Sequence, residues 1–288
     1  MKKLPVILLL ALLLTGCASQ PQAPIAATTL PVYEFTSRLC QGTPLTVTRL
    51  VTEQVSCLHD YSLKVQQVKA IQAADMVVIS GAGLEDFLDD VVPQEKTLDA
   101  SQGIALLESP GHCHAQDHEG HHHDHDPHIW LSPENAAQMA RTIAAGLTQR
   151  YPDHAPQFQE NLDTLLGDLD VLAAYGEEQL GQLRSRELIT FHDGFGYFAQ
   201  AFRLDILEAV EEESGSETSA KELIHLIDLV EQHRIPAIFT EVSGSTASAG
   251  ILSRETGCGC YALDMAMAGD SYFAAMYHNI DTIKEALG

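Results

Sequence analysis

Runs of apolar side chains with two different spacings divide the first half of the chain into strands and helices. Residues 45–50 alternate apolar and polar side chains, as a half-buried strand does, and the continuous apolar run 76–79 is typical of a buried parallel strand. Residues 63–74 have helical spacing, and a glycine turn at 80–83 leads towards a further helix. The pattern predicts βα units.

A second α/β region is expected from residue 184 onward, with strands at 188–191 and 238–240 and helices at 220–233, 249–255 and 272–287. The two regions are separated by helical patterns. The first is residues 133–149, where Ser132 is the expected N-cap and proline occupies the first position. The second is residues 156–183, which would extend for about 42 Å at 1.5 Å per residue. We therefore predict an α/β protein of two βα lobes, with small, mostly parallel sheets, joined by one long rigid helix.

The N-terminal residues have the pattern of an export signal. Two lysines precede an apolar run, Leu4 to Leu14, which is too short to span a bilayer as a helix. The run ends in Leu14-Thr15-Gly16-Cys17, which resembles a bacterial lipobox. That resemblance implies a signal peptide at 1–16 and lipidation of Cys17. The alternative is an ordinary secretory signal in which the cysteine occurs by chance.

The rest of the chain divides into four expected parts. Residues 17–29 are rich in Ala, Pro, Gln, Ser and Thr, a composition that predicts a flexible, lipid-anchored tether. An N-terminal lobe is expected at 30–155, the linking helix at 156–183 and a C-terminal lobe at 184–288.

The charge of the chain is strongly acidic. Its formal net charge is −24, and removal of the two lysines of the expected signal peptide would make it −26. Without a basic patch, nucleic acid is not expected as a partner. Acidity of this size favours solubility and the attraction of cations. We expect a monomer.

Two of the six cysteines form an expected disulfide. Cys40 and Cys57 flank the predicted strand at 45–50, and closing a loop of that length contributes about 3 kcal/mol in the chain-entropy model. Cys258 and Cys260 are separated by one glycine, and a bond between them would be strained. The state of these two cysteines and of Cys113 stays open.

Histidine is the residue type that points to chemistry, with 14 in the chain. One group lies in a biased insert at 112–125, interleaved with acidic residues, a composition suited to zinc, copper or nickel. The insert predicts an auxiliary metal-collecting or metal-sensing loop, and chelation without a role is the alternative. The histidines of this loop are His112, His114, His118, His121, His122, His123 and His125.

Three single histidines, His59, His128 and His192, lie instead in apolar surroundings. Each comes just after a predicted element or in a loop between two of them. In α/β lobes, ligands bind at the carboxyl ends of strands. One such histidine is more often structural than ligating, but three in matching contexts favour a metal site.

The sequence around two of these histidines resembles a known family. Asp-Pro-His-Ile-Trp-Leu at 126–131 and Phe-His-Asp-Gly-Phe-Gly-Tyr-Phe at 191–198 are similar to motifs of the metal-binding solute-binding lipoproteins of ABC importers, the zinc-binding ZnuA and AdcA group among them. Similarity extends from about residue 45 to the C-terminus and includes the segments 74–85 and 263–279. The resemblance implies a non-enzymatic metal carrier outside the cytoplasm, anchored to the cell membrane, which delivers Zn²⁺ to an ABC permease.

Carried over residue by residue, the resemblance implies four metal ligands. His59 and His128 come from the first lobe, and His192 and Asp264 from the second, which is a set that suits tetrahedral zinc. In the manganese-binding branch a carboxylate would be expected where His192 stands. The fourth position is the most open one, with Asp270, Glu241 or water as substitutes for Asp264.

Other functions are compatible with parts of this pattern. A manganese- or iron-binding homologue would use the same fold, and a zinc-dependent surface adhesin the same site. A secreted zinc hydrolase would need an open coordination position and a general base, for which Glu241 is a candidate. The hydrolase is disfavoured because none of the predicted helices contains a His-Glu-x-x-His sequence and the expected ligands are spread over two lobes.

Overall fold

A computed structural model of the chain describes residues 24–288 apart from 54, 56–57, 59–60, 109–124 and 211–217. Two four-stranded parallel sheets define two lobes, with strand orders β2-β1-β3-β4 and β6-β5-β7-β8. In both orders the first strand of the lobe lies inside the sheet, as in doubly wound α/β folds. The predicted fold class is confirmed.

The N-terminal lobe is built from short elements. Its strands are β1 (Pro24–Ala27), β2 (Thr46–Arg49), β3 (Met76–Ile79) and β4 (Thr97–Asp99). Its helices are α1 (Leu30–Leu39) and α2 (Val65–Ala73), with 3₁₀ turns at Asp86–Leu88, Gln94–Lys96 and Ile129–Leu131. The further helix expected after the glycine turn at 80–83 is therefore only the 3₁₀ turn Asp86–Leu88.

The C-terminal lobe repeats the same alternation. Its strands are β5 (Glu187–Thr190), β6 (Asp205–Ala209), β7 (Ala237–Glu241) and β8 (Gly259–Leu263). Its helices are α5 (Gly196–Phe202), α6 (Ala220–His233), α7 (Ala247–Thr256) and α8 (Tyr272–Leu287). The strand β7 is buried along its whole length, as expected for an interior strand of a sheet covered on both faces.

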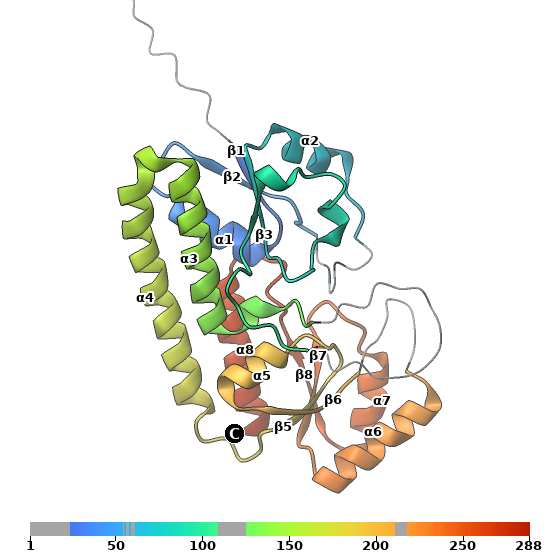
Figure 1. The fold of residues 1–288 in the computed structure, drawn as a ribbon. Coiled ribbons are helices and arrows are strands. Elements are labelled where there is room, and N and C mark those ends of the chain that lie inside the picture. Colours follow the sequence, from blue (N-terminus) through green and yellow to red (C-terminus); the bar gives the residue numbers. More distant parts are fainter. Residues whose placement is uncertain (1–23, 54, 56–57, 59–60, 109–124, 211–217) are drawn as a thin grey trace, which may run out of the picture.

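Two long helices lie in the chain between the two sheets. Helix α3 (Pro133–Arg150) begins at Ser132, whose hydroxyl accepts the Asn135 N–H, and a 3₁₀ turn at Pro152–His154 leads into α4 (Ala155–Leu180). At 1.5 Å per residue α4 is about 39 Å long. Figure 1 shows α3 and α4 along one side of the molecule, with α4 reaching from one lobe to the other. Within the described part of the chain, no helix combines the length and apolarity of a membrane span.

The lobes are also joined by direct hydrogen bonds to the segment between β8 and α8. The Trp130 Nε1–H donates to Met265 O at 2.8 Å, and the Leu30 N–H donates to Met267 O at 3.3 Å. The Tyr272 hydroxyl donates back to Trp130 O at 2.9 Å. These bonds lie within one apolar core that contains residues of both lobes. The two halves of the molecule are therefore fastened at several points besides α4.

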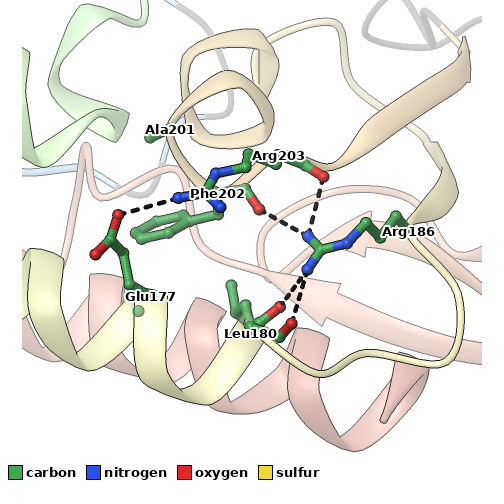
Figure 2. A pocket seen from close by; sticks show the side chains of 8 residues that line it. Glu177, Leu180, Arg186, Ala201, Phe202 and Arg203 are labelled. Carbon is green, nitrogen blue, oxygen red and sulfur yellow. Dashed lines mark hydrogen bonds and ion pairs between the residues drawn. The ribbon is translucent and has the colours of Figure 1, made fainter.

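One arginine fastens the end of α4 to the C-terminal lobe. Arg186, just before β5, donates hydrogen bonds to the terminal carbonyls of α4, Leu180 O and Gly181 O, and to those of α5, Phe202 O and Arg203 O. Figure 2 shows these four bonds at the edge of a small hollow. A cation is favourable there because the last carbonyls of a helix lack partners within the helix and carry partial negative charge.

The prediction of a tether over residues 17–29 is wrong from residue 24 onward. Residues 24–27 form the interior strand β1, which pairs with β2 on one side and β3 on the other. Its sequence, Pro-Ile-Ala-Ala, is too short and too poor in large apolar side chains to differ from a tether by composition. The linking helix predicted at 156–183 begins one residue earlier, at Ala155, and ends earlier, at Leu180. Residues 1–23, including the expected signal peptide and Cys17, lie outside the described residues.

The structure does not show the predicted bond between Cys40 and Cys57. Cys40 is a free, buried cysteine, and its predicted partner Cys57 lies outside the described residues. Burial raises the pKa of the Cys40 thiol to about 12. The bridge stays a prediction.

Candidate metal centre

Two imidazoles from different lobes face each other where the lobes meet. His128 lies just before the 3₁₀ turn Ile129–Leu131 of the N-terminal lobe, and His192 follows β5 of the C-terminal lobe. Their Nε2 atoms are 3.5 Å apart, and the ring planes are inclined by 80°. His128 is only 2% exposed. The structure therefore brings two of the four predicted ligands together.

Each imidazole is held by a carboxylate at its other nitrogen. His128 Nδ1 is 2.8 Å from Asp126 Oδ1, and this oxygen also accepts the His128 backbone N–H at 2.9 Å. His192 Nδ1 is 2.8 Å from Glu241 Oε1. A carboxylate at Nδ1 fixes the tautomer that has its proton on that nitrogen, which leaves a lone pair on Nε2.

The distance between the two Nε2 atoms fits a shared cation. Two lone pairs that point at each other repel unless a cation or a proton lies between them. With Zn–N bonds of 2.0–2.1 Å and a tetrahedral angle, two ligating nitrogens are about 3.4 Å apart. The observed 3.5 Å is close to that value.

The electrostatics of the site raise the pKa of His192. Burial alone lowers it, but the hydrogen bond and the negative charge of Glu241, with Asp193 and Asp126 adding to the effect, more than offset burial. The site therefore attracts positive charge, and a proton competes with a metal ion for His192 at a higher pH than at an isolated histidine.

A glycine permits the close approach of the rings. A Cβ atom on Gly194 would be 2.6 Å from His192 Cδ2, 2.9 Å from His128 Nδ1 and 2.6 Å from Met265 Cε. Real Cβ atoms do not come this close to other atoms, so a side chain at this position would displace the histidines. The motif that contains His192 thus supplies both the ligand and the space for its partner.

The second lobe presents three acidic or imidazole side chains at adjacent strand ends. His192 follows β5, Glu241 is the last residue of β7, and Asp264 follows β8, in the order in which these strands lie in the sheet. Asp264 Oδ1 accepts the Ala266 N–H at 2.8 Å. This is the carboxyl edge at which α/β sheets bind ligands.

The structure gathers only part of the predicted ligand set. Among residues 24–288 outside the gaps, no three His, Cys, Asp or Glu side chains are placed to hold a metal ion together, so Asp264 does not form such a group with His128 and His192. His59 lies outside the described residues. So do the auxiliary-loop residues His112, His114, His118, His121, His122 and His123, whereas His125 is exposed and its backbone forms an isolated antiparallel β-bridge with Glu108.

Sequence reasoning missed the roles of the two carboxylates. The sequence assigns no role of its own to Asp126, and it offers Glu241 only as a substitute ligand or a base. The Nδ1 partner of His192 is Glu241, which lies 49 residues away in the chain. The signal for Asp126 was its position two residues before His128, where one oxygen reaches both the backbone and the ring of the histidine.

Comparisons with known proteins agree with this geometry. The family described as "Zinc-uptake complex component A periplasmic" (ZnuA) matches residues 25–286. The chain belongs to this family. The resemblance to the ZnuA and AdcA group is thus confirmed.

Individual relatives of this ZnuA-family chain cover nearly all of it. The "Zinc-binding lipoprotein AdcA" of Streptococcus pneumoniae is 30% identical over 309 residues, which span 99% of this chain but 61% of AdcA. A crystal structure of ZnuA is 29% identical with a TM-score of 0.79, covering 93% of this chain and all of the other. The Zn(II)-bound ZnuA-like domain of S. pneumoniae AdcA is 27% identical with a TM-score of 0.76, covering 93% of this chain and 99% of that domain.

Proposed function

We propose that this chain captures Zn²⁺ outside the cytoplasm and delivers it to the permease of an ABC importer. The ion is cargo, held between the lobes by His128 and His192. His59 and Asp264 complete the proposed ligand set. The membership in the ZnuA family and the zinc-binding relatives support zinc as the ion and an ABC permease as the partner.

The observation that carries this proposal is the pair of carboxylate-held imidazoles. The Nε2 atoms of His128 and His192 face each other at 3.5 Å across the junction of the lobes. Asp126 and Glu241 keep the Nδ1 protons away from that gap. Such a pair is already arranged for a cation before one arrives, which reduces the cost of binding.

Zinc is favoured over manganese by the type of donor atoms. Neutral imidazole nitrogen suits zinc, whereas manganese favours oxygen ligands such as carboxylate and water. The nearest carboxylates, Asp126 and Glu241, each use an oxygen to hold a histidine. A site with His192 at its centre therefore selects the softer ion.

The hydrogen bond between Glu241 and His192 favours a carrier over a hydrolase. Its Oε1 is bound to His192 Nδ1, and the residue is 5% exposed. A general base for hydrolysis must reach a metal-bound water. Glu241 instead acts on the imidazole, so the residue that the hydrolase reading needed as a base has another role.

The proposal extends to the ends of the molecule and to its surroundings. The N-terminal cysteine Cys17 is lipidated and anchors a monomer to the outer side of the cell membrane. The histidine-rich loop 112–125 collects zinc close to the main site. The lipobox-like sequence and the composition of the loop support these parts, and the lipoprotein AdcA among the relatives supports the location.

The test is a competitive zinc titration of the purified chain against a chelator strong enough to empty weak sites. We expect one tightly bound Zn²⁺ per chain, which excess Mn²⁺ does not displace. The variants His128→Ala and His192→Ala are expected to lose it, whereas His225→Ala, an exposed histidine on α6, keeps it. Tight zinc that persists in both site variants would show that the proposed site is not the site of capture.

A further inference from the structure

The turn that carries Asp264 lies against the two imidazoles. The next residue, Met265, accepts the Trp130 Nε1–H on its carbonyl, and its Cε lies 2.6 Å from the Cβ position of Gly194, where both histidine rings converge. Small movements of this turn therefore change where the Asp264 carboxylate points relative to His128 and His192.

One side chain from α8 pairs with both backbone groups of Asp264. The Asp264 N–H donates to Asn279 Oδ1 at 2.7 Å, and the Asn279 Nδ2–H donates to Asp264 O at 2.7 Å. This two-point pairing is what a neighbouring strand would give. It acts just beyond the end of β8, at a residue that follows the strand.

The carboxylate itself is then oriented by the turn. Asp264 Oδ1 accepts the Ala266 N–H at 2.8 Å, and Ala266 has a positive φ of 55°. A left-handed conformation at an alanine is uncommon and costs energy unless its surroundings hold it. With Oδ1 held by the backbone, Oδ2 is the oxygen that a cation would take.

We infer that Asn279 is a positioning residue for zinc capture, which acts by fixing the backbone of Asp264 so that its carboxylate meets the ion. The inference rests on the proposed role of Asp264 as a zinc ligand. Asn279 does not touch the ion. It replaces the missing strand partner at the sheet edge and holds the backbone of Asp264 in place.

A role in packing alone does not account for this residue. Asn279 is fully buried in a helix, where an amide is a poor helix former and is costly to bury without partners. Leucine has a similar volume and would fill the same space. Both polar ends of the amide are instead used on one residue, Asp264.

The experiment is a double-mutant cycle on zinc affinity, measured by competitive titration of the full chain. Asp264→Ala and Asn279→Leu are each expected to weaken zinc binding, the latter by about 10- to 100-fold, as is typical when a group that orients a ligand is removed. In the Asp264→Ala background, Asn279→Leu is expected to cause no further loss, because it acts only through that carboxylate.

Asn161→Leu is the matched control, because the Asn161 Nδ2–H also donates to two backbone carbonyls, Leu39 O and Gln41 O, away from the site. It is expected to lower the unfolding midpoint without changing zinc affinity. If Asn279→Leu does not fold, Asn279→Asp serves, since it is isosteric and keeps the acceptor for the Asp264 N–H.

Three other outcomes of these affinity measurements would each contradict the inference, and each points to a different error. Equal losses from Asn279→Leu in both backgrounds would mean that it acts independently of Asp264. A loss in Asp264→Ala with none in Asn279→Leu would mean that the turn needs no positioning. Unchanged affinity in both single variants would remove Asp264 from the ligand set, while the His128 and His192 variants would still test zinc capture itself.

Discussion

The smallest functional unit of this protein is an imidazole and the carboxylate that holds it. Asp126 with His128 and Glu241 with His192 form two such units, one on each lobe. The carboxylate fixes the ring, selects the tautomer and raises the basicity of the nitrogen that would bind the ion. The same negative charge also strengthens competition by protons, so affinity and pH dependence are linked at these residues.

Zinc affinity is therefore expected to fall as the pH is lowered, beginning above the ordinary histidine pKa of about 6.5. The pKa of His192 is raised, so the proton is retained to a higher pH, and only the neutral ring binds the ion. In the variant Glu241→Gln the charge that raises the pKa of His192 against the effect of burial is gone. The fall in zinc affinity should therefore begin at a lower pH. Zinc titrations between pH 5 and pH 8 measure both curves.

In the metal-free protein, the contribution of His192 to folding stability depends on pH in the opposite direction to zinc affinity. A raised pKa means that the folded state binds the proton more tightly than the unfolded state does. The His192–Glu241 pair therefore stabilises the fold fully below the unfolded pKa of about 6.5 and loses this contribution as the pH rises through the folded pKa.

Identical pH curves of zinc affinity for the wild type and Glu241→Gln would contradict the assigned role of Glu241.

At this scale the sequence predicted the two facing imidazoles better than the carboxylates that hold them. His128 and His192 could be singled out because each stands in a short motif with local apolar context. Glu241 could not be assigned, since it meets His192 only when β5 and β7 become neighbours in the sheet. A contact between residues of separate strands depends on sheet order, which a single sequence does not encode locally.

At the scale of elements, the positions of the lobes depend on how α4 ends. Arg186 binds the last carbonyls of α4 and of α5 at once, so one side chain connects the linking helix to the first strand of the C-terminal sheet (Figure 2). The four bonds are charge-assisted on the donor side and reach carbonyls that have no partner further along their helices.

Replacing this arginine is expected to destabilise the fold. Arg186→Met should lower the free energy of unfolding by about 2 kcal/mol, the range for hydrogen bonds to charged groups. Urea unfolding followed by circular dichroism measures the loss. Arg254→Met, at an exposed arginine on α7, is the control and should leave the midpoint unchanged. Equal midpoints for the two variants would show that the bonds of Arg186 add no net stability.

Long periodic elements could be predicted from sequence, and short ones with weak patterns could not. Helices α6 and α8 were predicted at their observed bounds because an apolar face repeats over several turns. Strand β1 was assigned to a tether, because four residues of small side chains carry no period. Strand β8, Gly-Cys-Tyr-Ala-Leu, was missed for a similar reason. Burial of such strands is set by their neighbours in the sheet.

At the scale of the whole molecule, the lobes behave as one framework around the site. Bonds from Trp130 and Leu30 to the β8–α8 segment, and from Tyr272 back to Trp130, connect the lobes next to the imidazole pair. The apolar core is continuous across the same junction. We therefore expect the spacing of His128 and His192 to be largely set before the ion binds.

The histidine-rich loop is predicted to be separable from this framework. Changing its histidines to asparagine should lower the total zinc bound per chain and leave the tightest site intact, because His128 and His192 are held by Asp126 and Glu241. His125, whose backbone forms the β-bridge with Glu108, is left unchanged. Elemental analysis after equilibrium dialysis measures the stoichiometry, and a lost tight site would place capture in the loop. The changed residues are His112, His114, His118, His121, His122 and His123.

The most direct test of the account is a crystal structure of the zinc-loaded protein with anomalous data collected on both sides of the zinc absorption edge. The account predicts one strong anomalous peak between the lobes, about 2.0–2.1 Å from the Nε2 atoms of both His128 and His192. Asp126 and Glu241 should remain on the Nδ1 atoms. A peak that lies away from either Nε2 atom, or ligation through Glu241 with His192 displaced, would contradict the account.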